Sequence, residues 1–262
     1  MKILVTGASG FVGNRLIDKL HRYEINFLLR KKIPIQGRIF IGDLFDKEML
    51  LEASRVDAVV HLAGITDGDV YKTNYEGTKN LVDACVENRV KKFIFISSFN
   101  AILNTDYGKS KLKAEEYLKN SGLSYIVFRP TVIYGRNNKK DIGKYVNLIK
   151  FRIAPVPGNG ETKLQPLYVE DLAEIIVRSI ESNIKNKTYF VAGKDVLTFN
   201  EIVDIISRLL NKKAFRIKIP GFFVGLIDKS LLEDKVIKDN DVEKDFKIQM
   251  MGFEEGMKEI IP

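Results

Sequence analysis

A glycine-rich turn near the start of the chain constrains the fold more than any other feature of the sequence. It reads TGASGFVG at residues 6–13 and directly follows a β-branched apolar run. The spacing G-x-x-G-x-x-G excludes a P-loop, which needs G-x-x-x-x-G-K-[ST]. Between a strand and a helix, such glycines let backbone N–H groups approach a pyrophosphate at the helix N-terminus. The turn therefore predicts a dinucleotide site, and a tight turn that binds nothing is the alternative.

The first two thirds of the chain alternate short β-branched runs with amphipathic segments. This alternation predicts an α/β fold, a Rossmann-like, doubly wound parallel sheet with helices on both faces. Strands are expected near 2–6, 25–30, 38–41, 56–62, 90–97, 123–129 and 187–192. Helices are expected at about 11–23, 46–54, 70–88, 106–121, 140–151 and 169–182. Between Arg30 and Arg38 too few residues remain for a helical crossover, so a bare loop is expected there.

A change of pattern after Gly160 predicts a small C-terminal substrate lobe. The dinucleotide-binding domain is expected at 1–152 plus about 169–197, and the lobe at about 153–168 and 198–262. Thr198 and Glu201 have capping-box spacing at the start of a helix. A strand over 214–219, a short apolar helix over 220–231 and more helix in the tail are expected to follow.

Composition excludes several classes of protein. The single cysteine, Cys85, forbids an intramolecular disulfide, and His21 and His61 cannot form a Cys/His metal cluster with it. No apolar run is long enough to cross a membrane, so no membrane partner is expected. With no readable signal peptide, a cytoplasmic protein is expected. The net charge of +8 favours phosphate-bearing ligands, but nucleic acid is disfavoured because the basic groups lack interleaved aromatic residues.

The end of the second expected strand indicates which dinucleotide binds. An acidic residue there accepts the ribose hydroxyls of NAD, whereas an arginine suits the 2′-phosphate of NADP. Here Arg30 is followed by two lysines, and no acidic residue occurs before Asp43. NADP is therefore predicted over NAD, and stacking of Arg30 on the adenine is the alternative. Asp43 is expected near the adenine amino group or at a helix N-terminus.

A tyrosine and a lysine define the candidate catalytic group. Tyr107 and Lys111 are spaced i and i+4, which places them on one helix face. Bringing a phenol from a pKa of about 10 to about 7 requires about 4 kcal/mol. A lysine charge about 4 Å away supplies about that much at an effective dielectric of about 20. Ser98, at the end of the preceding strand, can offer its hydroxyl to the same substrate oxygen.

These residues resemble the short-chain dehydrogenase/reductase superfamily, in the extended or atypical branch of NAD-dependent epimerases and dehydratases. The resemblance is carried by TGASGFVG at 6–13, GDLFD at 42–46, HLAG at 61–64, NYEGTKNL at 74–81, FIFISS at 93–98, YGKSK at 107–111, RPTVIYG at 129–135 and YVEDLA at 168–173. The RPTVIYG segment and the stretch PVPGNGETKLQPLYVEDLA look more like the subgroup that contains the nucleotide-binding accessory subunit of respiratory complex I.

The resemblance implies a role for each matching residue. The pyrophosphate would be held by Gly7, Gly10, Phe11, Val12 and Gly13. Asp43 and Leu44 would contact the adenine, and Ala63 and Gly64 would flank the cofactor. Ser98 and Tyr107 would carry catalysis, Lys111 would bind the nicotinamide ribose, and Pro130 would pass near the nicotinamide.

Two departures from the sugar-nucleotide epimerases are visible. Only eight residues separate Ser98 from Tyr107, and Val132 stands where those enzymes tend to carry Asn. The first interpretation is an NAD(P)-dependent oxidoreductase or epimerase that transfers a hydride at a carbonyl or hydroxyl carbon. The second is a non-catalytic, NADP(H)-binding structural or sensing protein, and the third is an RNA-binding derivative of the same fold.

The expected substrate is a small molecule that is anionic or nucleotide-linked, with a plain carbonyl compound as the alternative. A basic surface on the second half of the chain supports this expectation. It comprises Arg136, Lys139, Lys140, Lys212, Lys213, Arg216 and Lys218. A homodimer is compatible with the sequence.

Overall fold

The computed structural model describes residues 1–138, 140–227, 229–239 and 241–261. Its contacts divide the chain into two compact units. Unit 1 comprises Met1–Arg129 and Ala173–Tyr189, and unit 2 comprises Pro130–Leu172 and Phe190–Pro262. Each unit has a hydrophobic core of its own.

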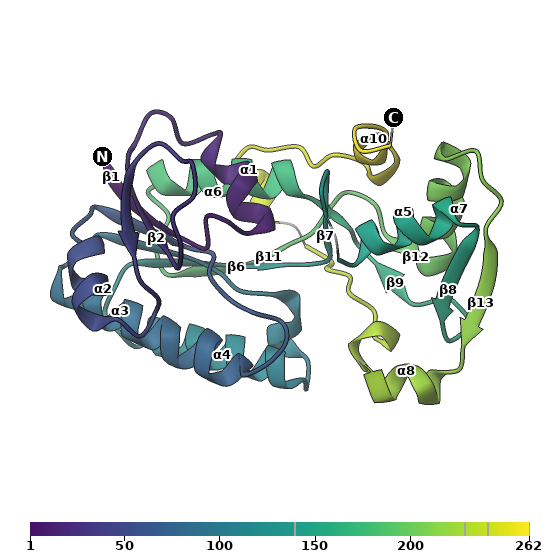
Figure 1. Ribbon diagram of the computed structural model, residues 1–262, viewed down its shortest axis with the longest axis horizontal. Helices are drawn as coiled ribbons and strands as arrows, with labels where there is room; N and C mark the ends of the chain where they lie inside the picture. The colour runs from purple at the N-terminus through teal and green to yellow at the C-terminus, as the bar shows by residue number, and fades with distance from the viewer. Residues whose placement is uncertain (139, 228, 240, 262) are drawn as a thin grey trace. The chain divides into compact units, whose positions relative to one another are not determined.

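A seven-stranded sheet organises unit 1 (Figure 1). Its strands are β1 (Lys2–Thr6), β2 (Glu24–Leu29), β3 (Arg38–Ile41), β4 (Ala58–His61), β5 (Lys92–Ile96), β6 (Tyr125–Pro130) and β11 (Lys187–Val191). Their order across the sheet is β11-β6-β5-β4-β1-β2-β3, and the pairings from β6 to β3 are all parallel. The order reverses at β1, as in a doubly wound sheet. The predicted Rossmann-like α/β fold is confirmed.

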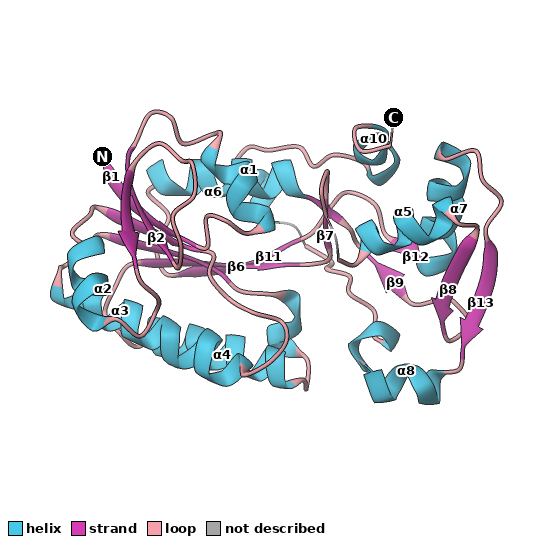
Figure 2. Cartoon of the chain, in the orientation of Figure 1, coloured by secondary structure: helices cyan, strands magenta, loops and turns pink. Residues whose placement is uncertain are grey.

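Helices cover both faces of this sheet (Figure 2). They are α1 (Phe11–Ile17), α2 (Lys47–Ala53), α3 (Gly77–Glu87), α4 (Asp106–Lys119) and α6 (Val169–Glu181). In Figure 1, α1 and α6 lie on one face, and α2, α3 and α4 lie on the other. A 3₁₀ turn, η2 (Phe99–Ile102), precedes α4, and a π-helical turn, η1 (Tyr71–Glu76), runs directly into α3.

The first helix ends six residues earlier than the sequence predicts. After Ile17 the chain turns through hydrogen bonds of the i to i−3 type, from Lys19 N to Leu16 O and from Leu20 N to Ile17 O. Leu16 and Leu20 are both fully buried. The apolar pattern thus continues beyond α1 because these turns also face the core. The expected bare loop between Arg30 and Arg38 is confirmed by the described residues, which contain no helix there.

Unit 2 is built from short elements. They are β7 (Ile133–Tyr134), α5 (Ile142–Lys150), β8 (Ile153–Pro157), β9 (Lys163–Leu164), β10 (Leu167–Tyr168), β12 (Leu197–Thr198), α7 (Phe199–Leu209), β13 (Phe215–Ile219), α8 (Gly221–Ile227), η3 (Lys229–Leu232), α9 (Asp241–Asp245) and α10 (Phe253–Lys258). The strands pair two by two, as β10 with β7, β12 with β9 and β13 with β8. Tyr134, Phe199 and Phe253 pack together in the core of the unit.

The capping box at the start of α7 forms as predicted. The Thr198 hydroxyl accepts from Glu201 N at 3.2 Å, and the Glu201 carboxylate accepts from Thr198 N at 2.7 Å. The predicted strand over 214–219 is found as β13, and the predicted apolar helix as α8 and η3. Among the described residues, no helix is long and apolar enough to span a membrane.

Candidate active site

In the glycine turn after β1, main-chain segments pack directly against one another, with no room for side chains between them. Gly7 has a φ of +73°, and a Cβ there would lie 2.6 Å from Ala63 N. A Cβ at Gly13 would collide with the carbonyl oxygens of Gly7 and Ala8. Gly10 N donates to Gly7 O at 2.9 Å, and no side chain of the described residues caps α1, which begins at Phe11. The turn therefore needs glycine at both ends and leaves its first helical N–H groups open to an anion.

A buried histidine ties this turn to the rest of the sheet. Thr6 Oγ1 and His61 Nδ1 are 2.6 Å apart, and His61 Nε2 and Thr78 Oγ1 are 2.9 Å apart. Thr78 donates its hydroxyl proton to Asn74 O, so the hydrogen-bond pattern assigns the His61 proton to Nε2. Burial, with a smaller contribution from the Lys111 charge, lowers the pKa of His61 to about 3. His61 is thus a neutral structural link, in line with its expected place at a strand end.

The residues predicted for the adenosine end lie at the carboxyl ends of β2 and β3. Arg30 is exposed, and its guanidinium has no partner in the described part of the chain. Asp43 is also exposed, and one of its carboxylate oxygens accepts from Phe45 N at 2.7 Å. The N-cap of α2 is Asp46, which removes the alternative of Asp43 at that helix terminus. Leu44 is buried, and a Cβ on Gly77 would lie 2.9 Å from it, so Leu44 packs at the start of α3.

Lys111 lies in the centre of the site in unit 1. Its Nζ donates to Ile96 O at 3.1 Å and stands 4.8 Å from the centroid of the Phe95 ring. A Cβ on Gly64 would come within 3.1 Å of the same nitrogen. Burial lowers the pKa of Lys111 to about 8, against the opposing charge of Glu115. The ammonium group therefore lies where the carboxyl ends of β4 and β5 meet.

Asn74 holds the loop that follows β4. Its Oδ1 accepts from Ile65 N at 2.9 Å, and its Nδ2 donates to Ile65 O at 2.9 Å. Nδ2 is also 3.1 Å from the Ser110 hydroxyl on α4. Asn74 is fully buried within the π-helical turn η1, a form often found at functional sites. It fixes Ala63 and Gly64 beside α4.

The short connection between Ser98 and Tyr107 folds into two capped turns. The Ser98 hydroxyl accepts from Asn100 N at 3.1 Å at the start of η2, and the Thr105 hydroxyl accepts from Gly108 N at 3.0 Å at the start of α4. A Cβ on Gly108 would collide with Asn100 O, so only glycine lets α4 approach η2 this closely. Ser98 and Tyr107 are both partly exposed. Direct packing of η2 on α4 therefore takes the place of a longer connection between Ser98 and Tyr107.

A buried carboxylate beneath the site was not predicted from the sequence. Glu115, fully buried on α4, accepts from the Ser97 hydroxyl at 2.6 Å and from Arg129 Nε and Nη2 at 2.9 and 2.6 Å. Lys119 Nζ lies 3.3 Å away. Ser97 directly follows β5 and precedes Ser98, and Arg129 is the last residue of β6 but one, next to Pro130. The only sequence signal was the position of Glu115 one helical turn after Lys111.

The remaining predicted residues belong to unit 2. Pro130 is buried at the end of β6, and Val132 packs against the core of the unit. In the predicted basic surface, Arg136 donates to Glu259 O at 3.1 Å and Arg216 pairs with Asp204. Lys139 lies outside the described residues. Two arginines of that surface are therefore already engaged within the unit.

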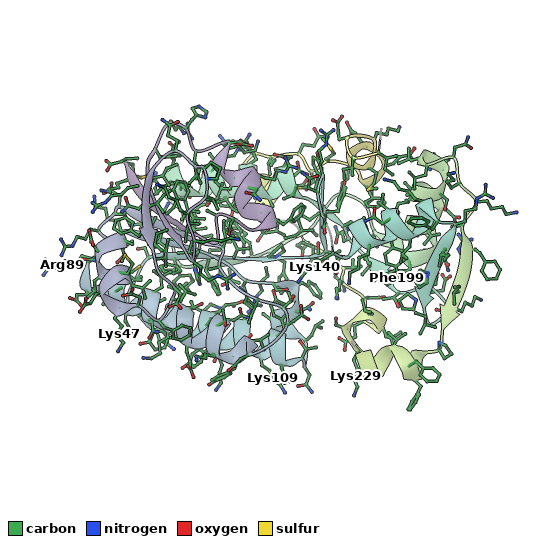
Figure 3. The ribbon with its side chains drawn as sticks, in the orientation of Figure 1. Lys47, Arg89, Lys109, Lys140, Phe199 and Lys229 are labelled. Carbon is green, nitrogen blue, oxygen red and sulfur yellow. The ribbon has the colours of Figure 1, made fainter. Side chains whose placement is uncertain are left out.

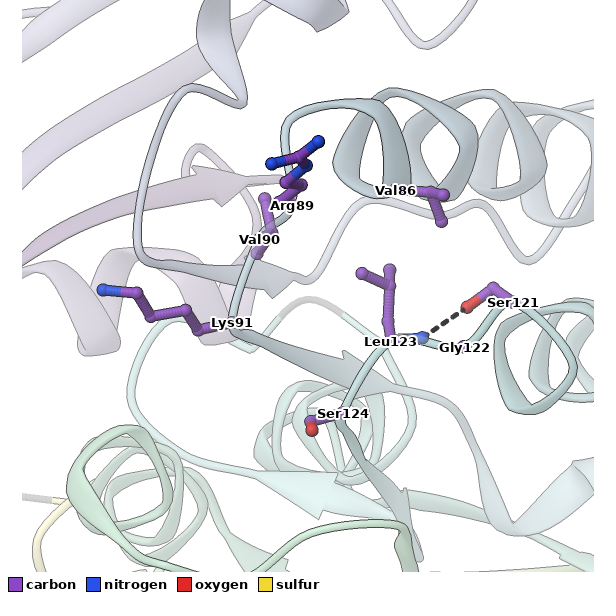
Figure 4. A pocket seen from close by; sticks show the side chains of 8 residues that line it. All are labelled: Val86, Arg89, Val90, Lys91, Ser121, Gly122, Leu123 and Ser124. Carbon is purple, nitrogen blue, oxygen red and sulfur yellow. Dashed lines mark hydrogen bonds between the residues drawn. The ribbon is translucent and has the colours of Figure 1, made fainter.

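A hollow of about 330 Å³ opens elsewhere in unit 1 (Figure 4). It lies at the amino ends of β5 and β6 and is lined by residues such as Arg89, Lys91 and Ser124. Ligands of open parallel sheets bind at the opposite, carboxyl ends. Because none of the predicted site residues lines this hollow, it plays no part in the site.

Two observations show that unit 1 fits a dinucleotide. The glycine turn is a cradle in which a side chain would collide with backbone. The Lys111 ammonium has three N–H groups, and the described residues provide one acceptor, Ile96 O. A buried donor with unused N–H groups suits the hydroxyls of a ribose.

The chain belongs to the NAD dependent epimerase/dehydratase family, whose model matches residues 3–193. It is therefore an enzyme of the epimerase/dehydratase class. A UDP-glucose 4-epimerase from Vibrio cholerae is 28% identical over 98% of this chain and 93% of its own length. The N-acetyl-α-D-glucosaminyl-diphospho-ditrans,octacis-undecaprenol 4-epimerase of Escherichia coli O157:H7 is 30% identical over 83% of this chain and 75% of its own length.

A solved structure supports the fold. The UDP-glucose 4-epimerase of Thermus thermophilus, determined with NAD, superposes with a TM-score of 0.85 at 21% identity and covers 100% of this chain and 98% of its own. The family match over residues 3–193 confirms the predicted membership of the epimerase and dehydratase branch. The dependence on a nicotinamide dinucleotide is confirmed at the level of the family. The roles of individual site residues stay predictions.

Proposed function

We propose that this enzyme is an NAD(P)-dependent epimerase or dehydratase that acts on a sugar joined to a diphosphate. The observation that carries the proposal is the buried Lys111 ammonium, which lies on α4 one turn after Tyr107 and at the carboxyl ends of β4 and β5. The two curated relatives support the substrate class, because both names describe a sugar carried on a diphosphate.

A bound dinucleotide would supply a hydride acceptor, and then a hydride donor, at a carbinol carbon of the substrate. The chain's own groups handle the proton. Tyr107 takes the proton from the substrate hydroxyl and returns it to the carbonyl oxygen. Lys111 favours the deprotonated phenol through its positive charge and donates to the ribose. Ser98 donates its hydroxyl to the same substrate oxygen and holds it in place.

The experiment is a substrate panel with product identification. Purified protein is incubated with UDP-glucose, UDP-N-acetylglucosamine, a dTDP-sugar and a polyprenyl-diphosphate-linked N-acetylglucosamine, and sugar epimers or dehydrated products are separated by chromatography. We expect Tyr107-dependent product from at least one of these substrates. If none reacts while small aldehydes or ketones consume NAD(P)H in a Tyr107-dependent way, the substrate is a plain carbonyl compound and the proposal fails.

The choice of dinucleotide depends on Arg30. The comparisons favour NAD, since the family is described by NAD and the Thermus enzyme was solved with it. Arg30 supports NADP, because a guanidinium to which the described residues offer no partner can hold a 2′-phosphate bidentately. Preferential binding of NADP(H) therefore stays a prediction.

Melting temperatures with equal concentrations of NADPH and NADH test this prediction, since a ligand that binds only the native state stabilises it by RT ln(1 + [L]/Kd), so the tighter ligand gives the larger shift. If Arg30 selects NADPH, Arg30→Asp lowers the NADPH shift and leaves the NADH shift. Equal losses for both would assign Arg30 to adenine stacking or packing, and a larger wild-type shift with NADH would establish NAD as the cofactor.

A further inference from the structure

Four phenylalanines of unit 2 are the most exposed large hydrophobic side chains among the described residues. Phe151, Phe222, Phe215 and Phe223 are 78%, 75%, 74% and 56% exposed. The next in rank, Met1 and Ile102, are at 52% and lie in unit 1. Large apolar side chains that gather on a surface mark a place of contact with another molecule or a membrane.

The four side chains come from neighbouring elements. Strands β8 and β13 run parallel with Phe215 opposite Ile153, and α8 begins two residues after β13. The rings of Phe222 and Phe223 lie 5.6 Å apart. In Figure 3, side chains of β13 and α8 project away from the ribbon. We name as the aromatic rim the set Phe151, Ile153, Phe215, Ile217, Phe222 and Phe223.

The core of unit 2 does not need the rim. Ala154 and Val156 of β8 and Val224 of α8 are buried, so these elements attach to the unit through other side chains. Among the strands that the structure describes, β13 pairs with β8 alone, and its residues from Phe215 to Lys218 are all exposed. The aromatic rim therefore faces outward, and its side chains are not part of the buried core of unit 2.

Basic residues lie next to the rim residues in the sequence, and one of them has an acidic partner in the structure. Segments 148–158 and 211–223 carry six Lys or Arg residues and no Asp or Glu. Arg216 pairs with Asp204. In the part of the chain that the structure describes, no carboxylate lies at ion-pair distance from the side chains of the other five, which are Lys150, Arg152, Lys212, Lys213 and Lys218. The surface thus combines exposed aromatic rings with unneutralised positive charge.

This combination fits an anionic lipid surface better than a protein. Lysine is depleted in protein interfaces, and lysine on an edge strand such as β13 discourages pairing with another strand. Lysine and arginine are instead attracted to anionic headgroups, while aromatic rings settle at the boundary between headgroups and acyl chains.

We propose that the aromatic rim docks unit 2 on an anionic phospholipid membrane. The phenylalanines enter the headgroup region, and the surrounding ammonium groups contact lipid phosphates. Such peripheral binding needs no membrane-spanning helix, so it is compatible with their absence from the described residues. It goes beyond the proposed function, does not depend on it, and revises the expectation that the protein has no membrane partner.

The primary test is co-sedimentation of the full chain with large vesicles of phosphatidylcholine alone or mixed equally with phosphatidylglycerol. We expect pelleting with the anionic vesicles at about 50 mM NaCl, at least about tenfold weaker binding to phosphatidylcholine alone, and release at about 500 mM NaCl, because salt screens the charges. Equal binding to both vesicles, or binding to neither, would overturn the proposal.

Matched variants locate the binding surface. Phe215→Ser with Phe222→Ser, and separately Lys212→Glu with Lys218→Glu, are each expected to weaken vesicle binding at least tenfold. Ile102→Ser, and Lys47→Glu with Lys185→Glu, change exposed residues of unit 1 and are expected to bind as wild type. Wild-type binding by the rim variants would remove the rim from the interaction.

Fluorescence gives a readout that does not depend on pelleting. The chain has no tryptophan, so Phe222→Trp and Ile102→Trp each carry a single reporter. A blue shift on adding anionic vesicles is expected for Phe222→Trp and not for Ile102→Trp. If light scattering instead shows a dimer that the Phe215→Ser and Phe222→Ser changes dissociate, and no blue shift occurs with vesicles, the rim binds a second copy and the membrane proposal is wrong.

Discussion

Unit 1 buries a group of polar side chains near the ends of its strands, whereas unit 2 exposes several phenylalanines. In unit 1, Glu115, His61, Asn74 and Lys111 are buried at or near the carboxyl ends of the strands, and each is held by hydrogen bonds. In unit 2, by contrast, the pairs Arg208 with Glu254 and Arg216 with Asp204 are largely exposed, and phenylalanines face outward.

This difference separates two physical tasks. Buried, hydrogen-bonded polar groups fix geometry, because moving one leaves another unsatisfied in a low-dielectric interior. Exposed pairs contribute little and tolerate movement. Unit 1 is therefore suited to keep catalytic side chains in a fixed geometry, whereas unit 2 is suited to bind other molecules. Substitutions placed in both units test this contrast.

The strongest response is expected from Tyr107→Phe. Loss of the phenol removes the proposed proton-transfer group, so turnover should fall about 10²- to 10⁴-fold. Dinucleotide binding should be retained, as measured by the shift in melting temperature. Tyr117→Phe is the control, because Tyr117 lies on the same helix and its hydroxyl donates to Asp83 at 2.5 Å. Comparable losses in both variants would show that the helix, and not the phenol, limits turnover.

Glu115→Gln tests the buried network of unit 1. The substitution removes the negative charge that Arg129 meets at Glu115, and breaking a buried pair in this way costs about 3–5 kcal/mol of unfolding free energy. The comparison is Glu254→Gln in unit 2, whose partner Arg208 lies 2.8 Å away on an exposed surface. Urea denaturation should show a clear loss for the first variant and no measurable change for the second. Similar losses of unfolding free energy in the two variants would contradict the contrast between the units.

Lys111 should make stability depend on pH. Because burial lowers its pKa to about 8 from the ordinary 10.5, the unfolded chain binds more protons than the folded protein between these values. Stability therefore rises with pH across that window. Relative to Lys111→Met, the wild-type unfolding free energy should increase by about 1–2 kcal/mol from about pH 8 to about pH 9.5. If urea denaturation shows that the difference in unfolding free energy between wild type and Lys111→Met does not change across this pH range, Lys111 keeps its ordinary pKa.

The weakest responses are expected from two threonine N-caps, one in each unit. Thr105 caps α4, and Thr198 caps α7. Alanine at either position should lower the unfolding free energy by about 1 kcal/mol. Only Thr105→Ala should also reduce turnover, since α4 carries Tyr107 and Lys111. An equal reduction of turnover by Thr198→Ala would show that the geometry of α7 also matters for the reaction.

Much of the fold could be predicted from local patterns. The seven strands of the large sheet, the bare loop after Arg30, the capping box at Thr198 and the glycine turn all depend on residues close together in the sequence. The spacing of Tyr107 and Lys111 likewise follows from one helical turn. Each of these features is decided by backbone sterics or by the period of a helix or strand, which a single segment already contains.

Only the tertiary structure decided which polar groups are buried and which apolar ones are not. In the sequence, Glu115 has the pattern of an ordinary exposed helical carboxylate. In the structure it is buried and accepts hydrogen bonds from Ser97 and Arg129, which lie at or beside the ends of two strands. The apolar pattern of Phe215 and Ile217 predicts a strand, yet it cannot say that β13 pairs with β8 at the edge of a two-stranded sheet and exposes these residues. The physical reason is that burial depends on partners supplied by distant segments, whereas periodicity records only how a segment's own residues are spaced.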